Sequence, residues 1–209
     1  VYDTIDIAFP IVHGTNVEDG TLQGYLKMFN IPYVGSDVSA SAFGMDKVVF
    51  KYILKEHGIP VLDCKCFSLE DYQKGIDAII SKIEDEFSYP VIVKPANLGS
   101  SVGIEVAQDK DQLQNALETA FGYAKKVVVE KAITNLKEVN CSVLGDWEDA
   151  KASECEEPVK TEEILSFHDK YLSASKKIGG GKNGGLKSSG SSMNAGVLKL
   201  PAEISKETK

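Results

Sequence analysis

The sequence predicts an α/β fold, because short apolar runs typical of buried strands alternate along the chain with segments that have the spacing of amphipathic helices. Two of these apolar runs, 5–12 and 91–93, end directly before loops that contain glycine and polar residues. In α/β proteins, ligand-binding groups gather at the carboxyl ends of strands. The fold class therefore also predicts two loops at which to look for function.

The charge of the chain limits the kinds of partner it can have. Its net charge is −8, from 31 acidic residues against 23 basic ones, and all of the latter are lysines. This composition argues against a nucleic-acid partner, which normally requires a basic face. No run approaches the roughly 20 apolar residues that span a bilayer, so we expect no membrane partner. The cysteines lack the spacing of metal ligands and are expected to be reduced thiols in the cytoplasm: Cys64, Cys66, Cys141 and Cys155.

The first loop follows residues 5–12, which we predict to form a buried strand. It begins with His13, continues through the acidic turn 15–20 and leads into a helix predicted over 21–29. Glu18 therefore lies near a helix N-terminus, where the helix dipole favours an acid. His13 and Glu18 are candidate functional residues, although a capping acid and an ordinary turn histidine also explain the pattern.

A short strand over 31–35 precedes a helix predicted over 42–57, which ends at Gly58. The usual meaning of a lysine stripe on such a helix is a solvated surface. Three lysines here recur at i, i+4 and i+8 and share one face: Lys47, Lys51 and Lys55.

The second loop is reached through a strand over 61–67 and a long helix over 69–87 that Ser68 caps. The apolar run 91–93 then predicts a buried strand that ends on Lys94, and a second β-rich run follows over 102–106.

Between these two runs the loop carries two glycines and two serines. Gly99 and Gly103 let the backbone approach a ligand, backbone and hydroxyl groups can donate to an anion, and Lys94 adds a positive charge. This pattern is typical of phosphate binding. It is not a Walker loop, which needs G-x-x-x-x-G-K-[ST] before a helix. An ordinary hairpin with a surface lysine is the alternative.

The remaining elements follow from spacing. A helix over 109–123 places four apolar residues inward: Leu113, Ala116, Leu117 and Ala120. The runs 126–133 and 138–145 predict an antiparallel hairpin. The segment 176–196, rich in glycine and serine, is predicted to be mobile.

Taken in order, these motifs resemble those of the D-alanine–D-alanine ligases, a family of the ATP-grasp superfamily. They occur in family order along nearly the whole chain. The matching motifs are His13-Gly14, Glu18-Asp19-Gly20-Thr21-Leu22-Gln23-Gly24, Ile31-Pro32-Tyr33-Val34-Gly35-Ser36, Met45-Asp46-Lys47, Lys94-Pro95, Gly99-Ser100-Ser101-Val102-Gly103, Val129-Glu130-Lys131, Glu138, Leu144-Gly145 and Asp169-Lys170-Tyr171.

The resemblance implies three structural regions with ATP-grasp lobes. Residues 1–38 would end an α/β N-terminal substrate-binding domain, 39–126 would form the central ATP-grasp lobe, and 127–209 would begin the C-terminal lobe. Members of the family carry further segments on both sides, so we expect an internal piece of a longer protein. The ligands of Mg²⁺ or Mn²⁺ are expected beyond Lys209, and the 209 residues alone are expected to make no dipeptide.

The resemblance also implies how ATP is bound. Lys47 and Lys94 would hold the phosphates. The loop with Ser100 and Ser101 would close over them. The adenine edge and the ribose would be bound by Glu130, Lys131, Ile133 and Glu138.

The implied reaction joins two D-alanine molecules through an acyl phosphate, as a step of peptidoglycan synthesis in the cytoplasm, with a homodimer as a possible assembly. Lys170 would contact the transferred phosphoryl group, and Tyr171 would bridge towards Ser100 and the second substrate. His13 and Glu18 would orient the first substrate. In phosphoryl transfer the protein mainly positions groups and spreads charge, so a set of lysines and amides suits the chemistry.

One departure from the family motif concerns substrate choice. The family pattern His-Gly-x-x-Gly-Glu-Asp-Gly has Val17 in place of its second glycine. A β-branched residue is a poor fit if that position needs a positive φ. Two alternatives therefore stay open, a related ligase that takes D-serine or D-lactate as second substrate and a nucleotide-binding relative without ligase activity.

Overall fold

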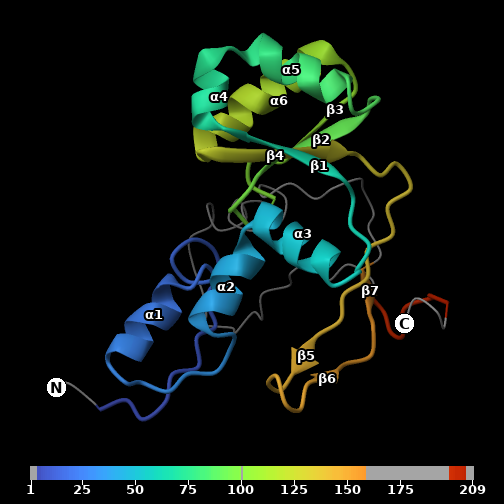
Figure 1. The fold of residues 1–209 in the computed structure, drawn as a ribbon. Helices are drawn as coiled ribbons and strands as arrows, with labels where there is room; N and C mark the ends of the chain where they lie inside the picture. The colour runs from blue at the N-terminus through green and yellow to red at the C-terminus, as the bar shows by residue number, and fades with distance from the viewer. Residues whose placement is uncertain (1–3, 100, 159–197, 206–209) are drawn as a thin grey trace, which may run out of the picture. The chain divides into compact units, whose positions relative to one another are not determined.

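The computed structural model describes residues 4–99, 101–158 and 198–205 (Figure 1). The chain divides into two compact units, Val1–Ala132 and Ile133–Lys209, and each is described by itself. Within the described ranges no helix is both long and apolar enough to cross a membrane.

A four-stranded antiparallel sheet organises the first unit. Its strands lie in the order β1-β4-β2-β3, with β1 at Cys64–Ser68, β4 at Lys126–Lys131, β2 at Val91–Pro95 and β3 at Glu105–Ala107. The predicted strand over 91–93 is thus confirmed, and it lies in the interior of the sheet.

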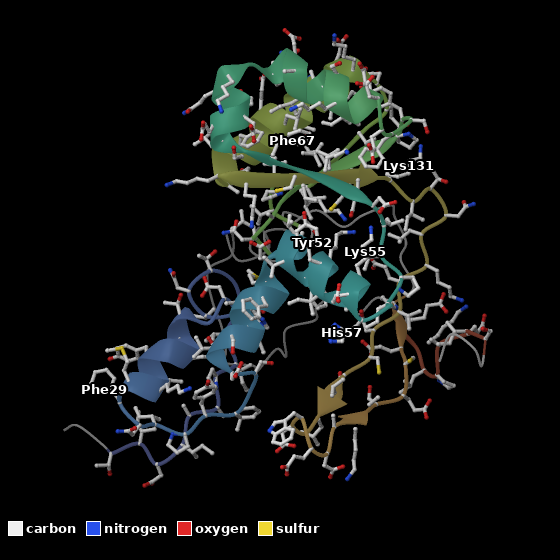
Figure 2. All side chains as sticks on the ribbon, in the orientation of Figure 1. Phe29, Tyr52, Lys55, His57, Phe67 and Lys131 are labelled. Carbon is white, nitrogen blue, oxygen red and sulfur yellow. The ribbon has the colours of Figure 1, made fainter. Side chains whose placement is uncertain are left out.

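Three helices cover one face of this sheet: α4 at Leu69–Lys74, α5 at Ile76–Glu84 and α6 at Lys110–Tyr123 (Figure 1). Phe67 points from β1 into the layer between sheet and helices (Figure 2). The four residues of α6 predicted to face inward are all buried there. We call this side the core face, and its core consists of Phe67, Ile79, Ile80, Ile83, Val91, Val93, Ala107, Leu113, Ala116, Leu117, Ala120, Phe121, Val127 and Val129.

Local capping explains where these helices begin. Asp109 accepts from the N–H of Gln112, as the predicted start of α6 requires. Ser68 and Asp71 form a reciprocal capping box at the start of α4. The prediction of one long helix over 69–87 is wrong, because Gly75 adopts a φ of 145° between α4 and α5.

The opposite face of the sheet is covered by α3, at Lys47–Glu56, and we call it the ligand face (Figure 1). The single helix predicted over 42–57 is divided into α2, at Val38–Met45, and α3. Asp46 causes the break, since its backbone is extended and its carboxylate caps α3 by accepting from the N–H groups of Val48 and Val49.

The start of the chain differs from the predicted buried strand. Apolar side chains of 5–12 are exposed, with Ile11 75% accessible. The only pairing of this run in the described ranges is one parallel bridge between Ala8 and Tyr33. A strand is buried only when other elements cover its edges and its faces. Among the described residues this run has a single bridged neighbour, so most of its apolar side chains remain exposed. The helix predicted next is confirmed as α1, at Thr21–Met28.

The predicted hairpin of 126–133 with 138–145 is also wrong. β4 pairs with β1 on one side and with β2 on the other, so it belongs to the central sheet. In the second unit, β5 at Val143–Leu144 pairs instead with β6 at Lys151–Ala152. That unit also contains β7, at Glu157–Pro158, paired with β8, at Leu198–Lys199.

Candidate functional site

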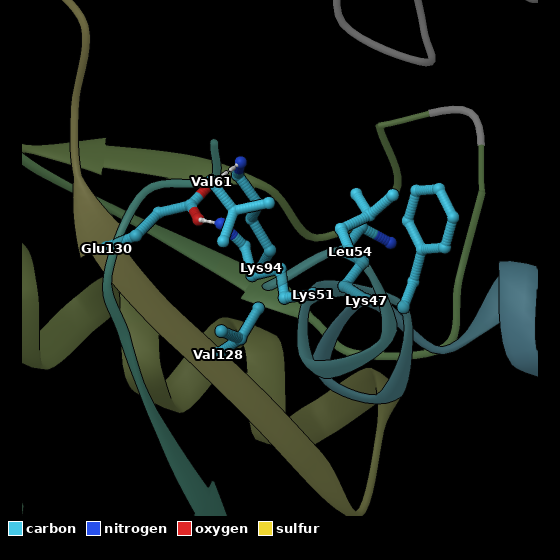
Figure 3. Close-up of a pocket in the computed structure, with 8 residues that line it drawn as sticks. Lys47, Lys51, Leu54, Val61, Lys94, Val128 and Glu130 are labelled. Carbon is cyan, nitrogen blue, oxygen red and sulfur yellow. Dashed lines mark hydrogen bonds and ion pairs between the residues drawn. The ribbon is translucent and has the colours of Figure 1, made fainter. Parts of the chain in front are cut away.

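A pocket of about 320 Å³ lies in the first unit, on the ligand face of the sheet (Figure 3). Its walls come from α3, from the strands β2 and β4 and from the segment before β1. Its lining combines aliphatic and aromatic side chains with three lysines and one carboxylate: Lys47, Phe50, Lys51, Leu54, Val61, Lys94, Val128 and Glu130.

The period-2 geometry of strands explains how the strand residues reach this pocket. Successive side chains of a strand point to opposite faces. In β2, Val93 faces the core while its neighbour Lys94 faces the pocket. In β4, Val129 likewise faces the core and Glu130 the pocket. The same strands therefore supply the apolar core and the charged groups of the site.

Glu130 is the centre of the charged cluster, with a side chain only 4% exposed. Lys94 donates a hydrogen bond to its Oε1, and the Nζ of Lys51 lies 2.6 Å from its Oε2 (Figure 3). Burial alone would raise the pKa of Glu130, but the ion pair with Lys51 and the hydrogen bond from Lys94 outweigh burial and hold that pKa below its usual value. Glu130 is therefore a buried carboxylate that two lysines keep ionised.

Lys47 lies at the first turn of α3, beside the end of β2. Its backbone N–H donates to the carbonyl of Ala96 at 2.8 Å, and its Nζ donates to the carbonyl of Leu98 at 2.6 Å. Burial, and then the positive charge of Lys94, lower the pKa of Lys47. An anion that binds between these two ammonium groups offsets the repulsion between their positive charges. This arrangement suits a polyanion such as a phosphate chain.

The N-terminus of α3 is held in place by a second charged contact. Lys126, at the start of β4, forms an ion pair with Asp46. The carbonyl of Lys126 also accepts from the N–H of Ala96 at 2.9 Å. The cap of α3, the end of β2 and the start of β4 are thus connected, which fixes the position from which Lys47 projects.

The loop between β2 and β3 contains a glycine that packs closely against the protein itself, and the predicted approach of its backbone to a ligand stays a prediction. Gly103 has a φ of 66°, and a Cβ at this position would lie 2.9 Å from the ring of Tyr123 and 3.0 Å from Pro95. Ser101 has a φ of 61°. A Cβ on Gly99 would lie 3.8 Å from the carboxylate of Glu18, so this loop approaches the first of the two predicted loops.

The structure brings His13 and Glu18 together. The Nδ1 of His13 lies 3.6 Å from Oε1 of Glu18, and the N–H of Gly14 donates to Oε2 at 2.5 Å. Val17 is not in the left-handed region. Besides the glycines at 14 and 20, the positive φ in this turn, 70°, falls on Asn16, a residue type that tolerates it. The strain foreseen for Val17 is therefore absent.

Lys131, predicted to meet the adenine edge, does not line this pocket. The amine of Lys131 donates to the carbonyls of Ser88 and Tyr89 at 2.7 and 2.8 Å, a contact that fixes the turn before β2. Ile133 and Glu138 belong to the second unit. Three predicted residues lie outside the described ranges, as does the segment 176–196: Ser100, Lys170 and Tyr171.

Sequence reasoning missed Lys51. Its place in the stripe of Lys47 and Lys55 predicted a solvated side chain, but it is only 18% exposed and pairs with Glu130. Lys55, one turn further, fits the prediction, with 70% exposure and an exposed partner, Asp63, at 3.3 Å. A signal was present, since residues i and i+4 share a helix face and Lys47 was already a candidate.

A divalent metal has no evident set of ligands in the part of the chain that the structure describes. No group of three or more His, Cys, Asp or Glu residues is placed there to hold an ion.

Comparison with protein families gives two matches. Residues 53–180 match the family model "D-ala D-ala ligase C-terminus", and residues 1–36 match "D-ala D-ala ligase N-terminus". Together the two models account for most of the chain.

Comparison with curated proteins gives relatives that are named D-alanine–D-alanine ligase. The chain is 45% identical over 174 residues to a D-alanine–D-alanine ligase of Acetivibrio thermocellus, covering 83% of this chain and 46% of the relative. It is 44% identical over 170 residues to a D-alanine–D-alanine ligase of Bacillus cytotoxicus, covering 81% and 46%. The chain thus spans about half the length of the curated relatives it matches.

Comparison with solved structures also gives ligases. The D-alanine–D-alanine ligase of Coxiella burnetii superposes with a TM-score of 0.68 at 33% identity, covering 84% of this chain and 49% of that one. The VanG D-Ala:D-Ser ligase of Enterococcus faecalis superposes with a TM-score of 0.67 at 33% identity, covering 78% and 48%.

Proposed function

The chain belongs to the D-alanine–D-alanine ligase family, and from this premise we propose that it is part of an ATP-dependent ligase that joins two D-alanine molecules for peptidoglycan synthesis. The observation that carries the proposal is the pocket on the ligand face. It places Lys47 and Lys94 beside each other, at the start of a helix and the end of a strand.

These two lysines are suited to the phosphates of ATP. Lys47 extends from the N-terminus of α3, where the helix dipole also favours an anion. Lys94 carries an ammonium group that can exchange a carboxylate oxygen for a phosphate oxygen. The apolar walls formed by Phe50, Leu54 and Val128 can cover part of a purine base, with Glu130 available to its polar edge.

The chemistry needs positioned charge rather than a protein nucleophile. A carboxylate oxygen of the first D-alanine attacks the γ-phosphorus of ATP, and ADP leaves. The amine of the second D-alanine then attacks the acyl phosphate, and phosphate leaves as the amide bond forms and the amine loses a proton. His13 and Glu18, close to the β2–β3 loop, are proposed to orient the first substrate. Ser100, Lys170 and Tyr171 are proposed to act on the phosphoryl group and the second substrate.

Mg²⁺ would neutralise charge between the phosphates when bound. The described residues do not supply its ligands, so we derive no step from it. Ile133, Lys131 and Glu138 remain proposed contacts of the adenosine part. The segments 1–38, 39–126 and 127–209 remain the proposed domains, and a cytoplasmic homodimer remains the proposed form of the enzyme.

A ligase with a different second substrate is the alternative. The structural likeness to a D-Ala:D-Ser ligase supports it. The loop 14–20, which carries Val17 where the family has glycine, is the part of the chain in which such a difference would be expected.

Phosphate release by the full-length protein tests both readings. We expect release from ATP to require D-alanine alone and to fail with L-alanine. Release that needs D-serine or D-lactate in addition to D-alanine would favour the alternative. Nucleotide binding without release in the presence of any of these would contradict ligase activity.

A further inference from the structure

Lys51 is a charged group of the pocket to which neither the motifs nor the proposed reaction assigns a role. It and Lys94 approach Glu130 from different elements, α3 and β2, and each takes one of the two carboxylate oxygens. The carboxylate is almost fully buried, whereas Lys51 and Lys94 are 18% and 23% exposed.

The two lysines differ in how firmly they are held. The Nζ of Lys51 also donates to the carbonyl of Leu62 at 2.9 Å, so it has two protein partners. Among the contacts of the described residues, Lys94 has Glu130 as its one polar partner. A ligand that competes for a lysine will therefore displace Lys94 more readily than Lys51.

The firmer hold on Lys51 matters because Glu130 is a buried charge that needs a counter-ion. Removing the single partner of a buried charge is costly, because the charge is left without compensation. With Lys51 in place, Lys94 can turn from Glu130 to an anion while the carboxylate keeps a counter-ion. Without Lys51, the same movement would leave Glu130 buried and unpaired.

We propose that Lys51 is the permanent counter-ion of Glu130, a positioning residue that frees Lys94 to move from Glu130 to the phosphates of the nucleotide. This inference rests on the proposed nucleotide site. According to this inference, two lysines of the pocket contact phosphate, Lys47 and Lys94, and Lys51 acts only by keeping Glu130 paired.

The titratable side chains that face Glu130 come from three elements. They are Lys47 and Lys51 from α3, Lys94 from β2 and the thiol of Cys64 from β1. In Lys51→Met the free protein still pairs Glu130 with Lys94, so the carboxylate is ionised. When nucleotide takes Lys94, the pKa of the isolated carboxylate rises and Glu130 binds a proton. Nucleotide affinity should then fall as pH rises.

The test is calorimetric titration of the full-length protein with a non-hydrolysable ATP analogue and Mg²⁺, in buffers of different ionisation enthalpy. Lys51→Met should bind on the order of a hundredfold more weakly near neutral pH. It should also take up close to one proton more than the matched control Lys55→Met, whose lysine lies outside the pocket and pairs with an exposed acid.

A second comparison removes the risk that Lys51→Met fails to fold. Once Glu130→Gln has removed the buried charge, adding Lys51→Met should change neither affinity nor proton uptake. Equal affinity of Lys51→Met and Lys55→Met would overturn the inference. So would a loss that persists in the Glu130→Gln background, which would mean that Lys51 contacts the nucleotide itself. Failure of the unaltered protein to bind nucleotide would instead overturn the proposed function, and this inference with it.

Discussion

The two faces of the central sheet are built from the same strands but differ in almost every other respect. The core face is apolar and buried, and it is covered by α4, α5 and α6 (Figure 1). The ligand face has a small apolar contact of Val48, Ala96 and Val128 under α3, and beside it lies the charged pocket. Because side chains alternate along each strand, the sheet can assign stability to one face and chemistry to the other.

This comparison predicts that the same substitution acts differently on the two faces. Leu117→Ala, at a fully buried position of α6, should lower the free energy of unfolding by about 2–5 kcal/mol and leave the nucleotide affinity of the folded protein unchanged. Leu54→Ala, in the pocket wall, should cost less than half as much stability and should weaken nucleotide binding. Denaturant unfolding and calorimetric titration of both variants measure the two effects. Equal profiles for the two variants would break the comparison.

The loop between β2 and β3 is the next position to test. Gly103→Ala puts a Cβ against Tyr123 and Pro95 at a positive φ, so it should destabilise the protein by about 1–3 kcal/mol. Gly122→Ala is the matched control, since it lies in α6 with open space around its Cβ position. Thermal unfolding should show the control unchanged or slightly stabilised. A neutral Gly103→Ala would mean that the loop does not need this approach.

A smaller, pH-dependent effect is expected at the cap of α3. Burial would raise the pKa of Asp46, but the hydrogen bond from Lys126 and the backbone N–H groups of α3 lower it. A lowered pKa stabilises the fold above the unfolded value, and that stability is lost as pH falls through the folded value. Asn can still cap a helix, so Asp46→Asn removes mainly the ion pair.

We expect Asp46→Asn to cost about 0.5–1 kcal/mol near neutral pH, because the pair is partly exposed. The difference from the unaltered protein should begin to shrink as pH falls below the ordinary aspartate value of 3.8, and it should disappear once pH lies below the lowered pKa of Asp46 in the folded protein. Urea unfolding at several pH values measures it. A difference that stayed constant with pH would contradict the ion-pair explanation.

The smallest effect should come from Lys55→Met at the exposed end of α3. Surface ion pairs contribute little, so the change in unfolding free energy should stay below about 0.5 kcal/mol, and nucleotide affinity should not change. A clear loss of nucleotide affinity would extend the ligand face beyond the pocket described here.

The sequence predicted the core face better than the ligand face. The apolar spacing of α6 and the run of β2 depend on local periodicity, and both were predicted correctly. The pairing of β4 was not, because periodicity shows that a segment is a strand but does not say which strands become its neighbours. The breaks at Asp46 and Gly75 were missed because each depends on the backbone angles of one residue.

Prediction of the pocket residues was limited in the same way, because local spacing does not reveal tertiary neighbours. Lys47 and Lys94 were predicted from motif and resemblance, and the structure places both in the lining. Lys51 was missed because a helical stripe tells which residues share a face but not how far along the helix that face remains covered. Only the tertiary position of β4, which brings Glu130 beneath α3, distinguishes Lys51 from Lys55.

The central claim, that the ligand face binds nucleotide phosphate through its lysines, is tested most directly by titrating Lys94→Met with a non-hydrolysable ATP analogue. Glu130 keeps Lys51 as its partner, so the variant should fold normally. A charge-assisted contact to phosphate contributes about 1.5–3 kcal/mol, so affinity should fall by roughly ten- to a hundredfold. Affinity equal to that of the unaltered protein would contradict the account.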